Sequence, residues 1–209
     1  MKLYLSSIEI PTPDDLAQLL GKPLNMVSIA LIPNAKDYYS KRARALILEQ
    51  RTSYFESLGL TATIVDLREF HQPEKLVSRL KGFDLIWGMG GNTYILRYEM
   101  KRSGFDAAIK ELLKLGIVYG GESAGALVAG DSLDGINLES ADEPGFAEEI
   151  VREGLKLVPY TIVPHADNPE FRSIMNAVAS RPDRHDKIIE PTDAQAVIFK
   201  NADYRIVGR

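Results

Sequence analysis

The feature that most constrains the fold is a regular alternation of two kinds of segment. Short apolar stretches rich in β-branched residues, such as 25–32 (NMVSIALI), are followed by longer stretches with apolar residues at helical spacing, such as 37–58. Strands joined through helices run parallel, so the pattern predicts an α/β protein: a mainly parallel sheet with helices on both faces. The strands are predicted at 1–6, 25–32, 61–67, 84–87, 117–119, 155–163, 187–189, 196–200 and 204–207, and helices at 37–58, 74–80, 92–100, 105–113, 124–129 and 169–179.

Length and composition narrow the class of protein. The chain has 209 residues, which suits one domain over residues 1–209 with a single core. Its net charge of −4 argues against nucleic acid as a partner, and no apolar run is long enough to cross a membrane. The first fifteen residues do not form a signal peptide, and the absence of cysteine fits a reducing compartment. We therefore expect a cytoplasmic protein; its oligomeric state stays open.

A serine lies in a Gly-x-Ser-x-Gly frame at residues 121–125 (GESAG). The predicted strand 117–119 precedes Ser123, small residues surround it, and a helix of small residues follows. This order is typical of a nucleophile elbow, in which a tight turn exposes the serine at the carboxyl end of a strand. The alternative is a glycine-rich turn that only packs closely against its neighbours.

A second glycine cluster, Gly88-Met89-Gly90-Gly91-Asn92, follows the preceding strand. It matches neither the dinucleotide fingerprint nor the P-loop, but it could hold a phosphate at the start of a helix. It could equally supply an oxyanion hole, since glycine lets backbone N–H groups approach a developing negative charge. In that case the N–H groups of Gly91 and Ala124 would form the pair of donors.

A serine nucleophile needs a base, and the chain has three histidines. His71 and His185 lie in polar, charged segments that predict solvated side chains. His165 follows the apolar run 160–164, and at the carboxyl end of a strand on the same sheet edge as Ser123 it suits a general base. Three residues are candidates for the carboxylate that orients the imidazole: Asp142 and Glu139 in the acidic segment 131–149, and Asp193. Asp167 suits a loop cap better.

The stretches 87–93 (WGMGGNT), 121–126 (GESAGA) and 163–165 (VPH) together resemble the peptidase E family. The family consists of serine peptidases with a class I glutamine amidotransferase-like fold, and the cyanophycinases are its relatives. The resemblance implies that Ser123 is the nucleophile, His165 the base and Gly91 the oxyanion glycine. It implies no metal and no organic cofactor. For the acid, 142–146 resembles one family loop, whereas Asp193 resembles a Glu-bearing turn.

Two departures from dipeptidase E bear on specificity. That enzyme tends to carry Trp where this chain has Glu122, and the arginine-rich segment after its base is replaced here by 166–172 (ADNPEFR). An Asp-x dipeptide substrate is therefore not implied. The candidates for substrate contact are Asn92, Glu122 and Arg172. We expect a serine peptidase acting on short peptides; the alternatives are a non-catalytic anion-binding α/β module and a general serine esterase.

Overall fold

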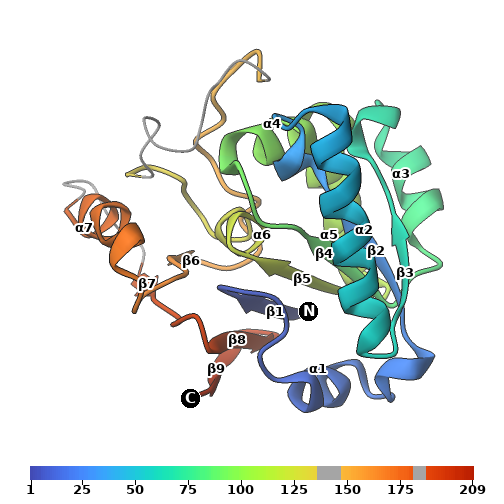
Figure 1. Ribbon diagram of the computed structural model, residues 1–209, viewed down its shortest axis with the longest axis horizontal. Coiled ribbons are helices and arrows are strands. Elements are labelled where there is room, and N and C mark those ends of the chain that lie inside the picture. Colours follow the sequence, from blue (N-terminus) through green and yellow to red (C-terminus); the bar gives the residue numbers. More distant parts are fainter. Residues whose placement is uncertain (136–146, 181–186) are drawn as a thin grey trace.

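A seven-stranded sheet with the strand order β3-β2-β4-β5-β1-β8-β9 forms the centre of the molecule (Figure 1). The computed structural model describes residues 1–135, 147–180 and 187–209. The sheet contains β1 (Lys2–Ser6), β2 (Ser28–Ile32), β3 (Thr61–Ile64), β4 (Leu85–Gly88), β5 (Val118–Glu122), β8 (Gln195–Lys200) and β9 (Asp203–Gly208). Strands β1 to β5 are parallel, and β8 and β9 add two antiparallel strands at one edge.

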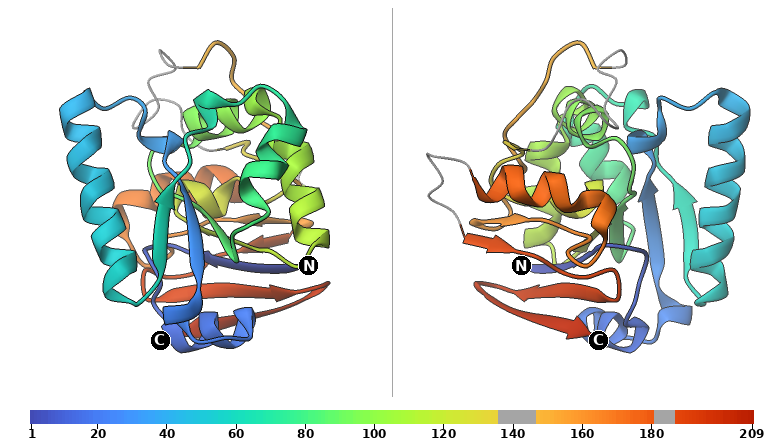
Figure 2. Two further views of the ribbon diagram at one scale, coloured as in Figure 1. Left: turned by 90° about the vertical axis from the view of Figure 1, so that its right-hand side faces the viewer. Right: turned by 60° about the vertical axis from the view of Figure 1, so that its left-hand side comes forward.

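Helices cover both faces of this sheet, and the predicted α/β fold is confirmed. Side chains alternate between the two faces along each strand: Leu3 and Leu5 belong to one core cluster, whereas Tyr4 between them belongs to the other. The helices α3 (Pro73–Leu80), α4 (Thr93–Ser103), α5 (Phe105–Lys114) and α6 (Ala124–Leu127) pack on the first face, and α1 (Pro13–Leu20) and α2 (Lys41–Ser57) pack on the second (Figure 2).

The parallel strands bring several loops to one rim of the sheet. β5 lies between β4 and β1, with Gly121 opposite both Gly88 and Leu5, and with Glu122 opposite Ser6. The residues that follow these three strands are therefore neighbours although they are far apart in the sequence. This rim is where ligands of open α/β sheets bind.

A separate two-stranded parallel sheet carries the segment that contains His165. It consists of β6 (Tyr160–Ile162) and β7 (Lys187–Ile189), and it lies with α7 (Arg172–Ala179) at one end of the molecule (Figure 1). The prediction that the base ends a strand on the same sheet as Ser123 was wrong. The neighbouring position beside β1 is filled by β8, which pairs with β1 in the antiparallel direction, so β6 pairs with β7 instead.

Other differences concern the ends of elements. The predicted helix 37–58 begins only at Lys41, because a short 3₁₀ turn, η2 (Asn34–Lys36), follows β2 and Ser40 caps α2. The predicted strand 61–67 ends at Ile64, since Asp66 caps a second 3₁₀ turn, η3 (Leu67–Glu69). The remaining 3₁₀ turns described are η1 (Leu24–Met26) and η5 (Pro169–Phe171).

One helix was not predicted. α1 begins at Pro13, has Asp14 and Asp15 in its first turn, and ends at Gly21 in the left-handed conformation. These are standard start and stop signals, so the sequence did contain the information. Among the described residues, no helix combines the length and the hydropathy that crossing a membrane requires.

Candidate active site

Ser123 occupies a strained turn between β5 and α6. Its backbone angles are φ 50° and ψ −113°, a conformation that residues with a side chain rarely adopt and that costs about 1–3 kcal/mol. The Ser123 N–H donates to the carbonyl of Ser6 at 3.0 Å, and its own carbonyl accepts from Ala126 and Leu127 at 2.9 Å each. The strand, the sharp turn and the helix together have the local geometry of a nucleophile elbow.

Small residues are required around this turn. A Cβ added to Gly125 would overlap with the backbone carbonyl of Gly88, and one added to Gly121 would overlap with the carbonyl of Gly125. The buried Tyr119 hydroxyl donates to the Gly125 carbonyl at 2.8 Å, which fixes the first turn of α6 against β5. The close approach of the β4 and β5 ends therefore depends on glycine at these positions.

The glycine cluster after β4 lies beside the serine. The Cβ of Ser123 is 3.1 Å from where a Cβ on Gly90 would be. Gly91 has φ 141°, and a side chain there would meet the carbonyl of Ala35. In the described part of the chain, neither the Gly91 N–H nor the Ala124 N–H donates a hydrogen bond. Both are available as donors to a ligand.

His165 and Asp193 form a hydrogen-bonded pair. The imidazole Nδ1 lies 2.6 Å from Oδ1 of Asp193. A carboxylate only accepts hydrogen bonds, so Nδ1 donates to it, and in the neutral form of the imidazole Nε2 is then the acceptor. His165 is 7% exposed, and its Nε2 is buried with no hydrogen-bond partner in the described residues. A buried ring nitrogen without a partner is unusual in a folded protein.

Three further residues hold this pair. The ring of Phe171 stacks on the imidazole, with centroids 4.2 Å apart and planes 19° apart. Asp167 accepts from the Asp193 N–H at 2.8 Å, so it acts as a loop cap, and the Asn168 side chain lies 3.5 Å from the second Asp193 oxygen. The base and its carboxylate are thus fixed within one local cluster.

Glu122 is almost completely buried, at 2% exposure, next to the serine. One carboxylate oxygen accepts from the Arg51 guanidinium at 2.5 Å and weakly from the Gly90 N–H at 3.4 Å, and the other accepts from the Glu9 N–H at 3.0 Å. Arg51 also pairs with the Glu9 carboxylate. Glu122 therefore joins the loops that flank Ser123, and both of its oxygens are already engaged within the protein.

The other residues named from the sequence are more dispersed. Asn92 is buried and caps α4, accepting from the Ile95 N–H at 2.8 Å. Arg172 is exposed at the start of α7, directly after Phe171. Asp142, Glu139 and His185 lie outside the described residues. His71 contacts the exposed side of Arg102, 3.2 Å from its guanidinium.

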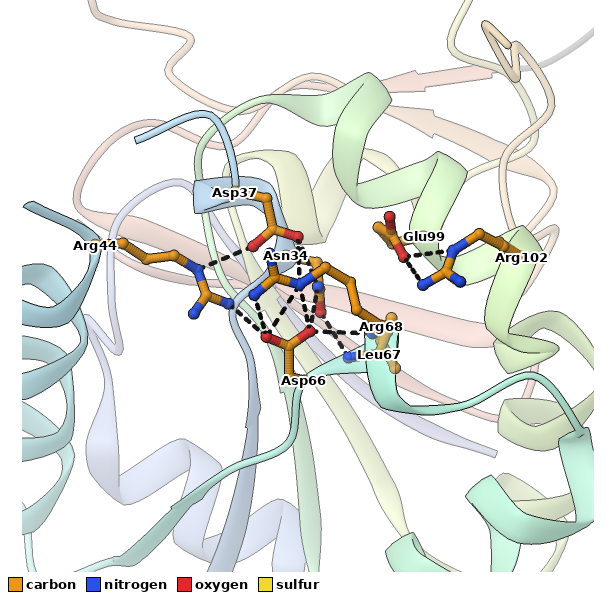
Figure 3. A network of polar contacts seen from close by, with 8 residues as sticks. All are labelled: Asn34, Asp37, Arg44, Asp66, Leu67, Arg68, Glu99 and Arg102. Carbon is orange, nitrogen blue, oxygen red and sulfur yellow. Dashed lines mark hydrogen bonds and ion pairs between the residues drawn. The ribbon is translucent and has the colours of Figure 1, made fainter. Parts of the chain in front are cut away.

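A polar network behind the glycine cluster was not identified from the sequence (Figure 3). At its centre the fully buried Asn34 accepts from the Leu67 N–H at 3.0 Å and donates to Asp37 at 2.8 Å and to Asp66 at 2.9 Å. Arg44 of α2 bridges the same two carboxylates, at 2.9 Å each. The available signal was that Asn34 and Asp66 each lie two residues after the end of one of two adjacent strands.

This network fixes η2, and η2 in turn contacts the glycine cluster. The carbonyl of Ala35, next to Asn34, accepts from the Asn92 N–H at 2.9 Å. Burial raises the pKa of Asp37. Burial also acts to raise the pKa of Asp66, but hydrogen bonds from Arg68 and Asn34 outweigh it and hold the pKa well below its ordinary value.

The fold and the elbow geometry define the class: an α/β protein with a serine on a strained strand-to-helix turn at the rim of a parallel sheet. Comparison with known sequences gives the family. The model of peptidase family S51 matches residues 7–207. The chain therefore belongs to peptidase family S51, and the peptidase E resemblance seen in the sequence is confirmed.

Individual proteins similar to this chain are also named as peptidases. The chain is 30% identical to the uncharacterized peptidase Lin0382 of Listeria innocua over 71% of this chain and 70% of that one. It is 27% identical to the uncharacterized peptidase PM1590 of Pasteurella multocida over 99% and 96% of the two chains. The chain is 30% identical to peptidase E of Streptomyces coelicolor over 69% of this chain and 57% of that protein.

Solved structures show the same fold. A crystal structure of a peptidase from an acI-B1 Actinobacterium superposes with a TM-score of 0.74 at 20% identity, covering 100% of this chain and 87% of that one. A Listeria monocytogenes structure gives a TM-score of 0.80 at 23% identity, covering 100% and 98%. These likenesses concern the arrangement of the backbone.

Proposed function

We propose that this member of family S51 is a serine peptidase that hydrolyses short peptides, with Ser123 as nucleophile, His165 as base and Asp193 as the orienting acid. One observation carries the proposal. Two consecutive residues, Ser6 and Ser7, bond the backbone of Ser123 and the backbone of His165, so the chain segments that carry the serine and the Asp193-bound imidazole are both anchored at the end of β1, which supports the proposal.

The reaction follows from these groups. Nε2 of His165 takes the proton from Ser123 Oγ, and the oxygen attacks the peptide carbonyl. The N–H groups of Gly91 and Ala124 donate to the oxygen of the tetrahedral intermediate, each worth about 3–4 kcal/mol. His165 then gives its proton to the leaving amine, and a water molecule, activated by the same nitrogen, releases the acyl group.

The His165 Nε2, which has no hydrogen-bond partner among the described residues, is compatible with this role. Catalytic hydrogen bonds are often long in a protein without substrate and shorten only in the complex. The strained backbone at Ser123 is a further support, since strain of this kind gathers at functional sites. The substrate class rests on the relatives named peptidase E.

A peptide library tests the proposal. Wild type should cleave some members of a mixed dipeptide and tripeptide library, and Ser123→Ala should cleave none, as read by mass spectrometry. Ser53→Ala, an exposed serine on α2, serves as the matched control and should keep wild-type activity. Cleavage that persists in folded Ser123→Ala would refute the proposal. Turnover of p-nitrophenyl esters without any peptide cleavage would instead indicate an esterase.

A further inference from the structure

The proposed nucleophile and base belong to different sheets. Ser123 follows β5 of the seven-stranded sheet, whereas His165 follows β6 of the two-stranded sheet, and Asp193 comes after β7. Their relative position must be set by contacts between the two sheets. The end of β1 supplies such a contact.

Ser7, the residue directly after β1, joins the two sheets through its side chain. Its hydroxyl is buried, at 1% exposure of the residue. It donates to the Pro191 carbonyl at 2.9 Å and accepts from the His165 N–H at 2.9 Å. The Pro191 carbonyl also accepts from the Ala166 N–H at 3.1 Å. The hydroxyl thus uses its one proton and one lone pair on the two segments that carry the base and the acid.

The backbone of His165 needs such support. Its φ is 68°, in the left-handed region that a residue with a side chain occupies at a cost. The bond from its N–H to the Ser7 hydroxyl and the bond from the Asn168 N–H to its carbonyl, at 2.9 Å, hold this conformation. Without the first bond, a buried N–H would be left unsatisfied unless the His165 segment moved.

We propose that Ser7 is a positioning residue, which sets the distance between the Ser123 hydroxyl and the His165 imidazole by tying both sheets to the end of β1. The neighbouring Ser6 carbonyl holds the Ser123 N–H, so one dipeptide fixes both partners. The inference rests on the proposed function, because it assigns Ser7 a task in that reaction. Ser7 itself touches neither the substrate nor the reacting atoms.

Kinetics of Ser7→Ala give the first test. A shift of about 1 Å in a catalytic group can lower the rate about a hundredfold, so we expect kcat to fall 10- to 100-fold while KM changes less than about twofold. Ser7→Thr, which keeps the hydroxyl, should recover most of kcat. Ser103→Ala removes a fully buried hydroxyl that bonds to Met100 within α4, and it should leave kcat unchanged. A folded Ser7→Ala with kcat within twofold of wild type would overturn the proposal.

Amide hydrogen exchange provides a readout that does not depend on activity. In wild type the His165 amide should be protected, and Ser7→Ala should raise its exchange rate at least tenfold, with the amides of β5 unchanged. If wild type cleaves no peptide and this local change still occurs, the proposed function fails, while the anchoring of the His165 segment by Ser7 stands. Unchanged exchange at His165 would overturn the positioning role. Should Ser7→Ala not fold, Ser7→Cys keeps the volume with a weak hydrogen-bonding group and should show the same losses.

Discussion

Ser123 and His165 both have positive φ angles, but different kinds of contact hold them. The surroundings of Ser123 come from adjacent parallel strands and from glycines whose spacing the sequence displays. His165 depends on a separate small sheet, on Asp193 28 residues later, and on Ser7 158 residues earlier. The comparison teaches that local sequence and the register of the paired strands place the nucleophile. The base is instead placed by side-chain contacts between residues far apart in the sequence.

The largest effect is expected for a substitution next to the proposed base, His165. Asp193→Asn leaves the shape of the loop but lets the imidazole adopt the wrong tautomer, so kcat should fall by about 10³- to 10⁴-fold. Steady-state kinetics on the best library peptide would measure it, and Asp14→Asn, an exposed carboxylate on α1, should have no effect. An activity loss below tenfold would mean that another carboxylate, such as Asp142 or Glu139, orients the base.

Around the proposed nucleophile, Ser123, we expect substitutions that disturb the packing to lower the stability of the protein. Gly125→Ala places a methyl group against the Gly88 carbonyl, and we expect the free energy of unfolding to drop by about 3 kcal/mol. Gly82→Ala is the matched control, since no atom lies within 4 Å of the added carbon, and its effect should stay within about 0.5 kcal/mol. Equal denaturation midpoints for the two variants would contradict the close packing of β4 against α6.

Glu122, the residue before Ser123, provides a second test of the contacts around the proposed nucleophile. Glu122→Gln removes the charge that faces Arg51 and turns an N–H donor toward the Glu9 N–H, so we expect a loss of about 2 kcal/mol in stability. Glu122 also accepts from the Gly90 N–H. We therefore expect Glu122→Gln to lower kcat as well as stability, while KM stays close to wild type. A large rise in KM alone would show that Glu122 contacts the substrate directly.

The polar network around Asp66 predicts that the stability of the protein depends on pH. Because hydrogen bonds hold the pKa of Asp66 below its ordinary value, its contribution to stability is full above a pH of about 4 and is lost as pH falls through the folded-state pKa. Asp66→Asn should therefore cost about 1–2 kcal/mol at pH 7, and the gap to wild type should shrink below about pH 4. Urea denaturation from pH 7 to pH 3 would measure it, with the exposed Asp203→Asn as control. A gap that stays constant would contradict the account.

The sequence was most informative where the signal is local. Apart from α1, the order of elements follows from spacing and residue type, and so do the glycine cluster and the turn at Ser123. The pairing of β6 with β7 was not predictable, because the periodicity of a three-residue strand does not say which strand it joins. Nor were the contacts of Ser7 and Asn34, since a single serine or asparagine after a strand has many possible partners.

The central claim is that Ser123 and His165, held by two sheets, act together on one peptide bond of the substrate. The most direct measurement is a crystal structure of the protein after reaction with a fluorophosphonate. We predict a phosphonyl group on Ser123 Oγ, with its free oxygen accepting from the N–H groups of Gly91 and Ala124 and with Nε2 of His165 facing the same phosphorus centre. A label on a different residue, or an adduct at Ser123 that His165 cannot reach, would contradict the account.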